Sequence, residues 1–197
     1  MEMSGEQLVP ASQQDTWNAL NDPDMLRQCV PGCESIEPLS ENQYEVLMVA
    51  RVGPVSAKFK GKLSLSDINP PNSYSMAFEG QGGAAGFAKG GAQVRLSEKD
   101  KHTLLAYDVK ASVGGKLAQI GSRLVDAAAK KVADDFFRNF NEKVGALHQP
   151  AAHLEEEEHH PAPSGRDPDL PNLSNTTLIF FAAGALVVAA VALLVLL

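Results

Sequence analysis

The sequence predicts an α+β domain in which a curved antiparallel sheet grips one long helix near the end of the domain. Three observations support this prediction. Segments between residues 43 and 113 alternate apolar and polar side chains, which is the period of half-buried strands. Two short helical patterns precede these segments. A run without proline, rich in Ala, Leu, Lys and Arg, follows them over residues 114–147 and favours a helix.

The bulk composition fits one domain with appendages. The chain has 197 residues and a net charge of −7, but residues 1–148 hold 16 Lys and Arg against 18 Asp and Glu, so most of the acidity follows them. No basic stripe favours a nucleic-acid partner. The two cysteines make no disulfide framework and no secretory signal leads the chain, which favours a reducing, cytoplasmic-side compartment.

The first forty residues predict one strand and two short helices. Residues 3–10 can form the strand, and Ser12 is the expected N-cap of the first helix. Trp17 should point inward from that helix. Pro23 is acceptable in the first turn of the second helix, which a Pro31-Gly32 turn ends.

Five strands with one apolar face are predicted next. The alternation is clearest in residues 55–66, where Lys58, Lys60 and Lys62 should point outward. Such a lysine stripe usually discourages aggregation through the sheet, and a docking surface for an acidic partner or lipid headgroups is the alternative. The predicted strands are Gln43–Val52, 55–66, 73–79, 88–97 and 103–113.

The helical run 114–147 carries two apolar sets whose faces are rotated apart. It should therefore bend near residues 129–132 or wind around a curved surface. Its aromatic second half should fill a core. Its first half, with Gly121 and three alanines, either leaves a cavity beneath it or is closed by short sheet side chains. The two sets are Leu117, Ile120, Leu124, Ala127 and Ala128, and Phe136, Phe137, Phe140, Val144 and Leu147.

No motif predicts a catalytic or metal site. Residues 80–85 fit G-x-G-x-x-A, but a strand pattern follows where a dinucleotide-binding helix would be needed. The stretch 80–91 forms either tight backbone contacts or a mobile lid that carries Phe87. No histidine has a suitable catalytic partner, and Cys29 and Cys33 lack a second pair of zinc ligands.

The composition changes abruptly after the helical run. Residues 149–175 contain five prolines and a run of four glutamates, which predicts a disordered linker behind a domain of residues 1–148. Residues 178–197 carry no charge and no proline, and their length matches a bilayer core of about 30 Å. We therefore expect residues 176–197 to be a single-pass C-terminal anchor in the cell inner membrane, with the domain on the cytoplasmic side.

Several stretches together resemble the carbon monoxide dehydrogenase G-subunit family, within the START-like (SRPBCC, Bet v 1-like) helix-grip superfamily. The resemblance covers residues 2–147. The turn Cys29-Val30-Pro31-Gly32-Cys33-Glu34 and the helix start Gly114-Gly115-Lys116-Leu117 are its most specific parts. The other matching parts are Asp22-Pro23, residues 51–55, Phe59-Lys60-Gly61, residues 80–91 and Phe136-Phe137 with Phe140.

The resemblance implies a seven-strand sheet around the last helix, with an apolar cavity between them. It also implies a non-enzymatic role beside a molybdenum-containing carbon monoxide dehydrogenase or related hydroxylase. Family members are thought to recruit that enzyme to the membrane and to handle its quinone acceptor. We therefore hypothesise a tethered module that carries a quinone, menaquinone or ubiquinone, between the lipid bilayer and the dehydrogenase. A purely structural anchor and a START-like enzyme acting on a hydrophobic substrate are the alternatives.

The carrier hypothesis needs an apolar pocket with few polar groups. Gln119 or Tyr107 is expected to supply a hydrogen bond to a quinone oxygen. The expected apolar lining is Val52, Phe59, Phe78, Phe87, Leu117, Ile120 and Leu124.

Overall fold

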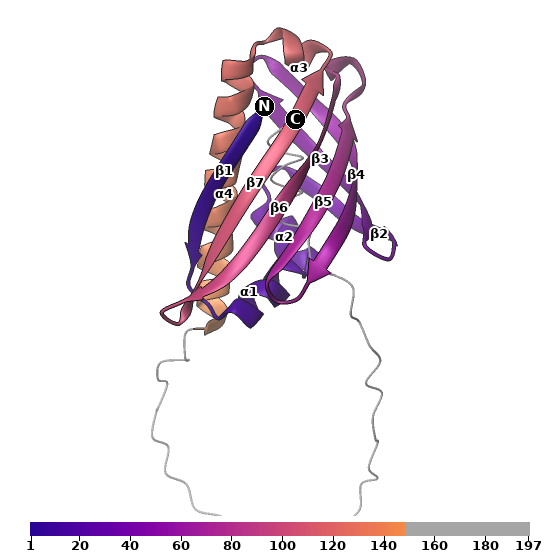
Figure 1. The fold of residues 1–197 in the computed structure, drawn as a ribbon. Coiled ribbons are helices and arrows are strands. Elements are labelled where there is room, and N and C mark those ends of the chain that lie inside the picture. Colours follow the sequence, from indigo (N-terminus) through magenta and orange to yellow (C-terminus); the bar gives the residue numbers. More distant parts are fainter. Residues whose placement is uncertain (149–197) are drawn as a thin grey trace, which may run out of the picture.

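A seven-stranded antiparallel sheet curls around one long helix (Figure 1). The computed structural model describes residues 1–148, and the strand order in the sheet is β1-β7-β6-β5-β4-β3-β2. The predicted α+β helix-grip architecture is thus confirmed. The strands are β1 (Glu2–Val9), β2 (Cys33–Ser40), β3 (Gln43–Val52), β4 (Val55–Asn69), β5 (Ser73–Gln81), β6 (Phe87–Lys99) and β7 (His102–Gly114).

The predicted linker, residues 149–175, and the predicted anchor, residues 176–197, lie outside the described residues. Within residues 1–148, no helix is both long enough and apolar enough to span a membrane.

Four helices and one 3-10 turn complete the domain. Ser12 caps the first helix by accepting a hydrogen bond from the Asp15 amide, as the sequence predicts. Asp22 caps the second helix, which has Pro23 in its first turn. These elements are α1 (Gln13–Leu20), α2 (Pro23–Cys29), η1 (Gly83–Ala85), α3 (Lys116–Gln119) and α4 (Ser122–His148).

The alternating patterns place the strands as predicted. In β3 the side chains of Val46, Met48 and Val52 are buried, and in β4 every second residue from Phe59 to Leu65 is buried. Lys58, Lys60 and Lys62 are exposed on the outer face, where Lys58 pairs with Glu34 and Lys60 pairs with Glu45. The alternation in the sequence therefore reflects side chains that point in turn to the inner and the outer face of this sheet.

β2 is not predicted by the alternation, and only the family resemblance implies a seventh strand. Its one buried residue is Ile36, so it has no periodic apolar face. Pro38 supplies no backbone N–H, and two register shifts interrupt the pairing of β2 with β3. These are features of a short edge strand, and they hide it from pattern analysis.

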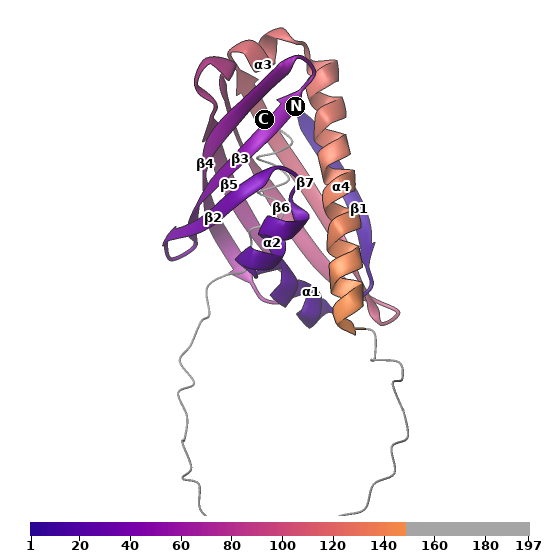
Figure 2. The same ribbon diagram turned by 180° about the vertical axis from the view of Figure 1, so that it is seen from behind.

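α4 lies along the open side of the curled sheet, where it contacts both β1 and β3 (Figure 2). Its second half is aromatic and packs tightly. The Phe137 ring stacks on Tyr107 of β7 at 5.5 Å between centroids, and the Phe136 and Phe140 rings also lie 5.5 Å apart. This half closes the end of the domain that holds α1 and α2.

The helical run is broken at Gly121, not bent near residues 129–132. Gly121 has φ +93°, a conformation that side-chain-bearing residues rarely adopt, and it separates α3 from α4. α4 then continues unbroken to His148. Because the break resets the helical phase, the faces predicted across it are wrong in part: Leu124 is 49% exposed and Ala127 is exposed. Leu147, also expected in the core, is 68% exposed.

The break at Gly121 gives a paired test. A Cβ at Gly121 meets no neighbour within 4 Å, so Gly121→Ala should cost only its backbone strain, about 1–2 kcal/mol of unfolding free energy. Gly145 lies inside α4, where an added Cβ would make an ordinary 3.5 Å contact with Pro10, so Gly145→Ala should stabilise by about 0.5–1 kcal/mol. Urea unfolding followed by circular dichroism measures both. Equal effects of the two substitutions would show that Gly121 has no special backbone role.

Candidate functional site

Five of the residues expected to line a cavity converge on the inside of the sheet. They are all buried, and they come from four strands and α3: Val52, Phe59, Phe78, Tyr107 and Leu117. Glycines let the two phenylalanine rings lie flat against the backbone. A Cβ on Gly82 would sit 2.1 Å from the Phe59 ring, and a Cβ on Gly90 would sit 2.7 Å from the Phe78 ring. The interior is therefore apolar and closely fitted on the sheet side.

The first half of α4 presents only small side chains to this interior. Val125, Ala129 and Ala133 are buried at intervals of four residues, and Ala128 and Val132 are partly buried. These residues extend the apolar face of Phe136 and Phe140 towards the start of α4. The predicted thinness of this half is confirmed, but Val125, Ala129 and Ala133 take the place expected for Leu124 and Ala127. Counting back from Phe136 and Phe140 in steps of three or four residues identifies Ala133, Ala129 and Val125 as the buried face of this half.

Two surface grooves flank this thin half of α4. One, of ≈ 370 Å³, lies between α4 and the end of β3, where Ala50, Val52, Ala128 and Val132 line it. β2 pairs with β3 only as far as Met48, so the last residues of β3 form an open edge beside the helix. Lys131 donates a hydrogen bond to Asp135 at this rim, which lowers the pKa of the carboxyl group.

The second groove, of ≈ 150 Å³, lies on the opposite side of α4. Ala111 and Val113 of β7, Ala118 of α3 and Val125 of α4 line it, together with Met1. Both grooves reach side chains of the inward face. The thin half of α4 is thus bordered on each side by an opening that small apolar side chains line together with polar ones, Arg51, Lys131 and Asp135 in the first groove and Ser122 and Asp126 in the second.

Four of the expected lining residues are less buried. Phe87 is 45% exposed on the outer face of β6, where its ring lies over Gly114. Leu124 lies over the β3–β4 turn, 3.6 Å from the position of a Cβ on Gly53. Gln119 is exposed, and Ile120 is partly buried against the core. These residues surround the end of the domain instead of lining its interior.

The stretch 80–91 makes tight backbone contacts, which is one of the two interpretations that the sequence leaves open. A Cβ on Gly86 would sit 2.0 Å from the Gly114 carbonyl oxygen, and one on Gly115 would sit 2.5 Å from the Gly86 Cα. A strand, β6, follows η1, so the dinucleotide motif has no helix to bind a pyrophosphate. The loop therefore ties the end of β5 to the start of α3.

Among the described residues, the interior holds few polar groups. The Tyr74 hydroxyl is fully buried and has no hydrogen-bond partner, and the same holds for the Thr16 hydroxyl. Burial raises the pKa of Tyr74, so its hydroxyl stays protonated and can donate. Tyr107 lies over Gly5 of β1, and its pKa is raised by burial and, to a smaller extent, by Asp134. Sequence analysis missed Tyr74 because a missing partner leaves no sequence signal.

The two cysteines are held as neutral thiols. Burial raises the pKa of Cys29 and of Cys33 to about 11, so both remain protonated near neutral pH. Within residues 1–148, no three His, Cys, Asp or Glu side chains are grouped as metal ligands.

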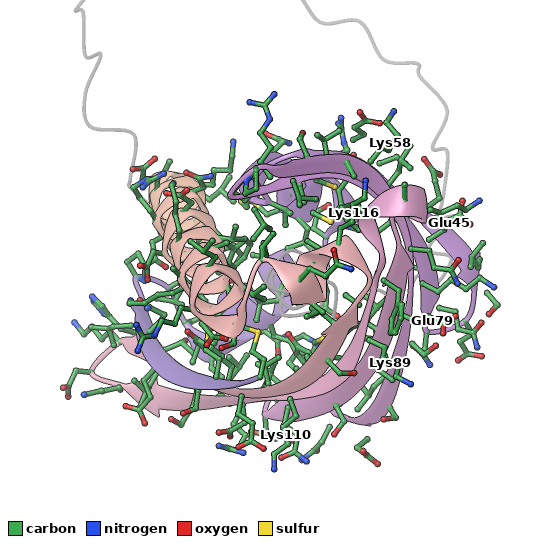
Figure 3. The ribbon with its side chains drawn as sticks, turned by 90° about the horizontal axis from the view of Figure 1, so that it is seen from above. Glu45, Lys58, Glu79, Lys89, Lys110 and Lys116 are labelled. Carbon is green, nitrogen blue, oxygen red and sulfur yellow. The ribbon has the colours of Figure 1, made fainter. Side chains whose placement is uncertain are left out.

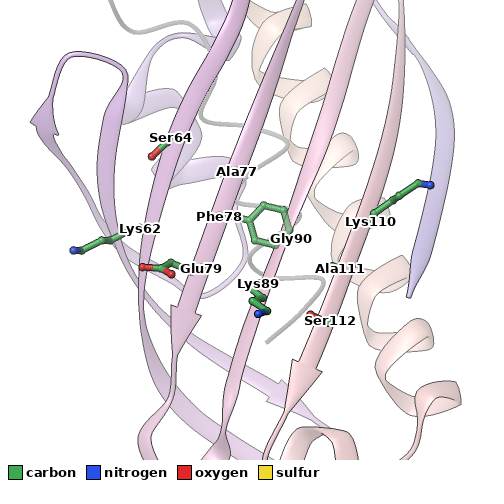
Figure 4. A pocket seen from close by; sticks show the side chains of 10 residues that line it. All are labelled: Lys62, Ser64, Ala77, Phe78, Glu79, Lys89, Gly90, Lys110, Ala111 and Ser112. Carbon is green, nitrogen blue, oxygen red and sulfur yellow. The ribbon is translucent and has the colours of Figure 1, made fainter.

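A larger hollow, of ≈ 650 Å³, lies on the outer face of the sheet (Figure 4). Lys62, Glu79, Lys89 and Lys110 stand around it, and the Phe78 ring shows beside Gly90 at its floor. It is shallow and of mixed charge, and it does not lead to the first half of α4. We therefore place the candidate site at the two grooves beside the first half of α4.

Comparison with known proteins identifies the family of this chain and a solved structure that resembles it. Residues 5–145 match the family described as the carbon monoxide dehydrogenase G-subunit (CoxG). A conserved protein from Geobacillus kaustophilus is 30% identical in sequence, with a TM-score of 0.71 over 76% of this chain and 98% of that one. No curated protein matches the chain.

Two more distant structures show the fold alone. A START superfamily protein from Mycobacterium smegmatis is 16% identical, with a TM-score of 0.58 over 74% of this chain and 98% of its own. The ZhuI aromatase/cyclase from Streptomyces sp. R1128 is 13% identical, with a TM-score of 0.56 over 78% of this chain and 99% of its own. The fold of this chain is therefore START-like.

The unpaired Tyr74 hydroxyl leads to a stability prediction with a built-in control. Tyr74→Phe removes a buried donor that has no partner, so it should raise the unfolding free energy by about 1 kcal/mol. Thr103→Val removes a buried hydroxyl that donates to the Ala11 carbonyl oxygen at 2.9 Å. This substitution should lower the unfolding free energy by about 1 kcal/mol or more. Thermal and urea unfolding distinguish the two. A destabilised Tyr74→Phe protein would mean that the hydroxyl has a partner.

Proposed function

Because the chain belongs to the carbon monoxide dehydrogenase G-subunit (CoxG) family, we propose that it is a non-enzymatic accessory protein that binds a long apolar molecule between its sheet and α4. The bound molecule is a quinone, such as menaquinone or ubiquinone. The family description names a carbon monoxide dehydrogenase. We propose that the partner is such an enzyme, containing molybdenum, or a related hydroxylase.

The observation that carries this proposal is the pair of grooves beside the thin half of α4. They connect the surface to the inward-facing side chains of β3, β7 and α4 on both sides of the helix. The apolar side chains of α4 that line the grooves are small, Val125, Ala128 and Val132, and polar residues of α4 stand at both rims, whereas the other half of the helix is anchored by aromatic stacking. A long apolar molecule gains free energy by moving from water into such a site, in proportion to the apolar area that it buries.

The buried polar groups support a quinone as the ligand. A quinone is an apolar ring and chain with two carbonyl oxygens, each of which accepts a hydrogen bond. The Tyr74 hydroxyl is a buried donor without a partner, and it lies beside Trp17 at the aromatic end of the interior, outside the lining of both grooves. A quinone ring that enters as far as this end would remove the cost of leaving the hydroxyl unpaired, so Tyr74 joins Tyr107 as a candidate donor in place of Gln119, whose side chain is exposed.

The interior offers little for catalysis. Its buried polar residues among those described are Thr16 and Thr103, with Tyr44, Tyr74 and Tyr107 as phenols. Proton transfer during catalysis needs groups whose pKa values lie near the working pH, and burial moves the tyrosines away from it. We therefore propose a carrier and not an enzyme, although the ZhuI aromatase/cyclase shares the fold.

The proposal includes membrane anchoring because of the sequence beyond the described residues. Residues 178–197 are uncharged and long enough to span a bilayer core. A single-pass anchor there would hold the domain at the cytoplasmic face of the inner membrane. Tethering would raise the local concentration of the domain next to membrane-dissolved quinone.

A groove-filling substitution tests ligand binding. Ala128 is partly buried and lines the groove between α4 and β3, so Ala128→Trp should fill it and lower the co-purifying quinone by about tenfold or more. Ala127 is its exposed neighbour on the same helix, so Ala127→Trp should leave the quinone content unchanged. The full chain is purified from a quinone-containing membrane host and its bound molecules are measured by native mass spectrometry.

The outcomes separate the proposals. Equal quinone content in the two variants would mean that the quinone reflects bulk lipid carried with the tail. A protein without bound quinone that still retains the dehydrogenase would be a structural anchor. Turnover of a hydrophobic substrate by the purified chain would favour the enzyme.

A further inference from the structure

Charge is distributed very unevenly between the two ends of this domain. Three segments meet at the end that holds α3: residues 51–58, 80–89 and 114–124 (Figure 1). Together they carry five cationic residues and no Asp or Glu, although residues 1–148 as a whole are slightly acidic. The five are Arg51, Lys58, Lys89, Lys116 and Arg123. We call this the basic end.

Contacts confirm that the three segments form one surface. Leu124 lies over the β3–β4 turn at Gly53, and Gly86 packs against Gly114 and Gly115. Seen from above, α3 lies across the end of the interior and carries Lys116, while Lys58 and Lys89 point outward from the curved sheet (Figure 3). Arg51, Lys116 and Arg123 are exposed and form no ion pair with another described residue. The nearest acids lie outside the segments: Glu34, which pairs with Lys58 at 2.7 Å, Glu79 and Asp126.

The basic end also carries large apolar side chains in solvent. Phe87 is 45% exposed and Leu124 is 49% exposed, and both belong to the segments that carry these cations. Pro54, Ala84 and Ala118 are exposed on the same end. Aromatic and aliphatic side chains surrounded by Lys and Arg are typical of surfaces that lie in the headgroup region of an anionic bilayer.

The opposite end has the reverse character. The helices α1 and α2, the turns of the sheet and the last turns of α4 meet there (Figure 2). This end carries four cations, Arg27, Lys99, Lys101 and Lys143, against eight acids. The acids are Asp15, Asp22, Asp24, Glu41, Asp67, Glu98, Asp100 and Glu142. An anionic surface would therefore repel one end of the domain and attract the other.

We infer that the basic end docks on an anionic lipid bilayer, with Phe87 and Leu124 inserted at headgroup depth and Arg51, Lys116 and Arg123 facing lipid phosphates. This inference rests on the proposed function, because it supplies the surface through which a membrane-dissolved molecule reaches the grooves. Both grooves begin next to this end: Val52 follows Arg51, and Ala118 lies between Lys116 and Arg123. A docked domain would take up its ligand without exposing it to water.

The chain length permits this orientation. α4 leaves the domain at the acidic end, so the linker must run back along its length, which is about 40 Å for the 27 residues of α4. Residues 149–175 reach up to about 90 Å when extended. The sequence therefore allows the acidic end to carry the tether while the basic end faces the bilayer.

The test places a tryptophan at each end of the full chain, reconstituted into vesicles whose acyl chains are brominated. Phe87→Trp probes the basic end, and Leu8→Trp, at a position 47% exposed on β1, is the matched probe away from it. The native Trp17 is buried and contributes the same background to both. We expect strong quenching of the Phe87→Trp probe in vesicles that contain phosphatidylglycerol, weak quenching in phosphatidylcholine alone, and little quenching of the Leu8→Trp probe in either.

Charge reversal sharpens the test. Arg51→Glu and Arg123→Glu should each lower the docking equilibrium constant by about 25-fold, because each reversal changes the charge by two units and one unit near an anionic surface contributes about fivefold. Lys99→Glu and Lys101→Glu, at the acidic end, should not lower it. Equal quenching of the two probes, or no dependence on lipid charge, would overturn the inference. A Phe87→Trp signal that changes only when the dehydrogenase is added would assign this end to protein docking instead.

The same samples separate this inference from the proposed function. Quinone that is retained without lipid docking would remove only the docking surface. Docking without bound quinone would leave the surface in place and remove the carrier role.

Discussion

The burial of one apolar sheet face by a single helix is the constraint on which this structure depends. Seven strands spaced about 4.8 Å apart make a sheet roughly 30 Å wide, whereas a helix with its side chains is only about 10 Å across. One helix can cover such a face only if the sheet curls around it. α4 therefore bridges β1 and β3, and the side chains it presents decide how full the interior is.

α4 meets that constraint differently in its two halves. The second half fills the space with Phe136, Phe137 and Phe140, and the pair of Trp17 with Tyr74, 5.7 Å apart, adds to the same packing. The first half offers Val125, Ala129 and Ala133 and begins at a glycine joint. One half is thus closely packed, and the grooves lie beside the other half, where the apolar side chains of the helix are small.

Much of this organisation follows from local sequence chemistry. The period of two identifies the inward residues of β3 to β7, and Ser12 and Pro23 mark the helix starts, because these signals depend only on near neighbours. The helical phase of α4 does not follow from local sequence, because Gly121 interrupts the helix and Leu124 then lies in solvent. The Tyr74 hydroxyl, the open edge of β3 and the two charged ends depend on which distant segments meet, and no single stretch of sequence carries that information.

The pairing of β1 with β7 determines how late in its synthesis the domain can complete its fold. Strands β2 to β7 each pair with the strand next to them in sequence, but Glu2 pairs with Lys110 and Val9 with Thr103. On the ribosome, the first strand emerges about a hundred residues before its partner, and contacts so distant in sequence close slowly. The apolar side chains of α1 and α2 stay uncovered over the same interval. The packing of the first strand and helices therefore cannot be completed until α4 has been synthesised, and nearly the whole domain must leave the ribosome before its two ends join.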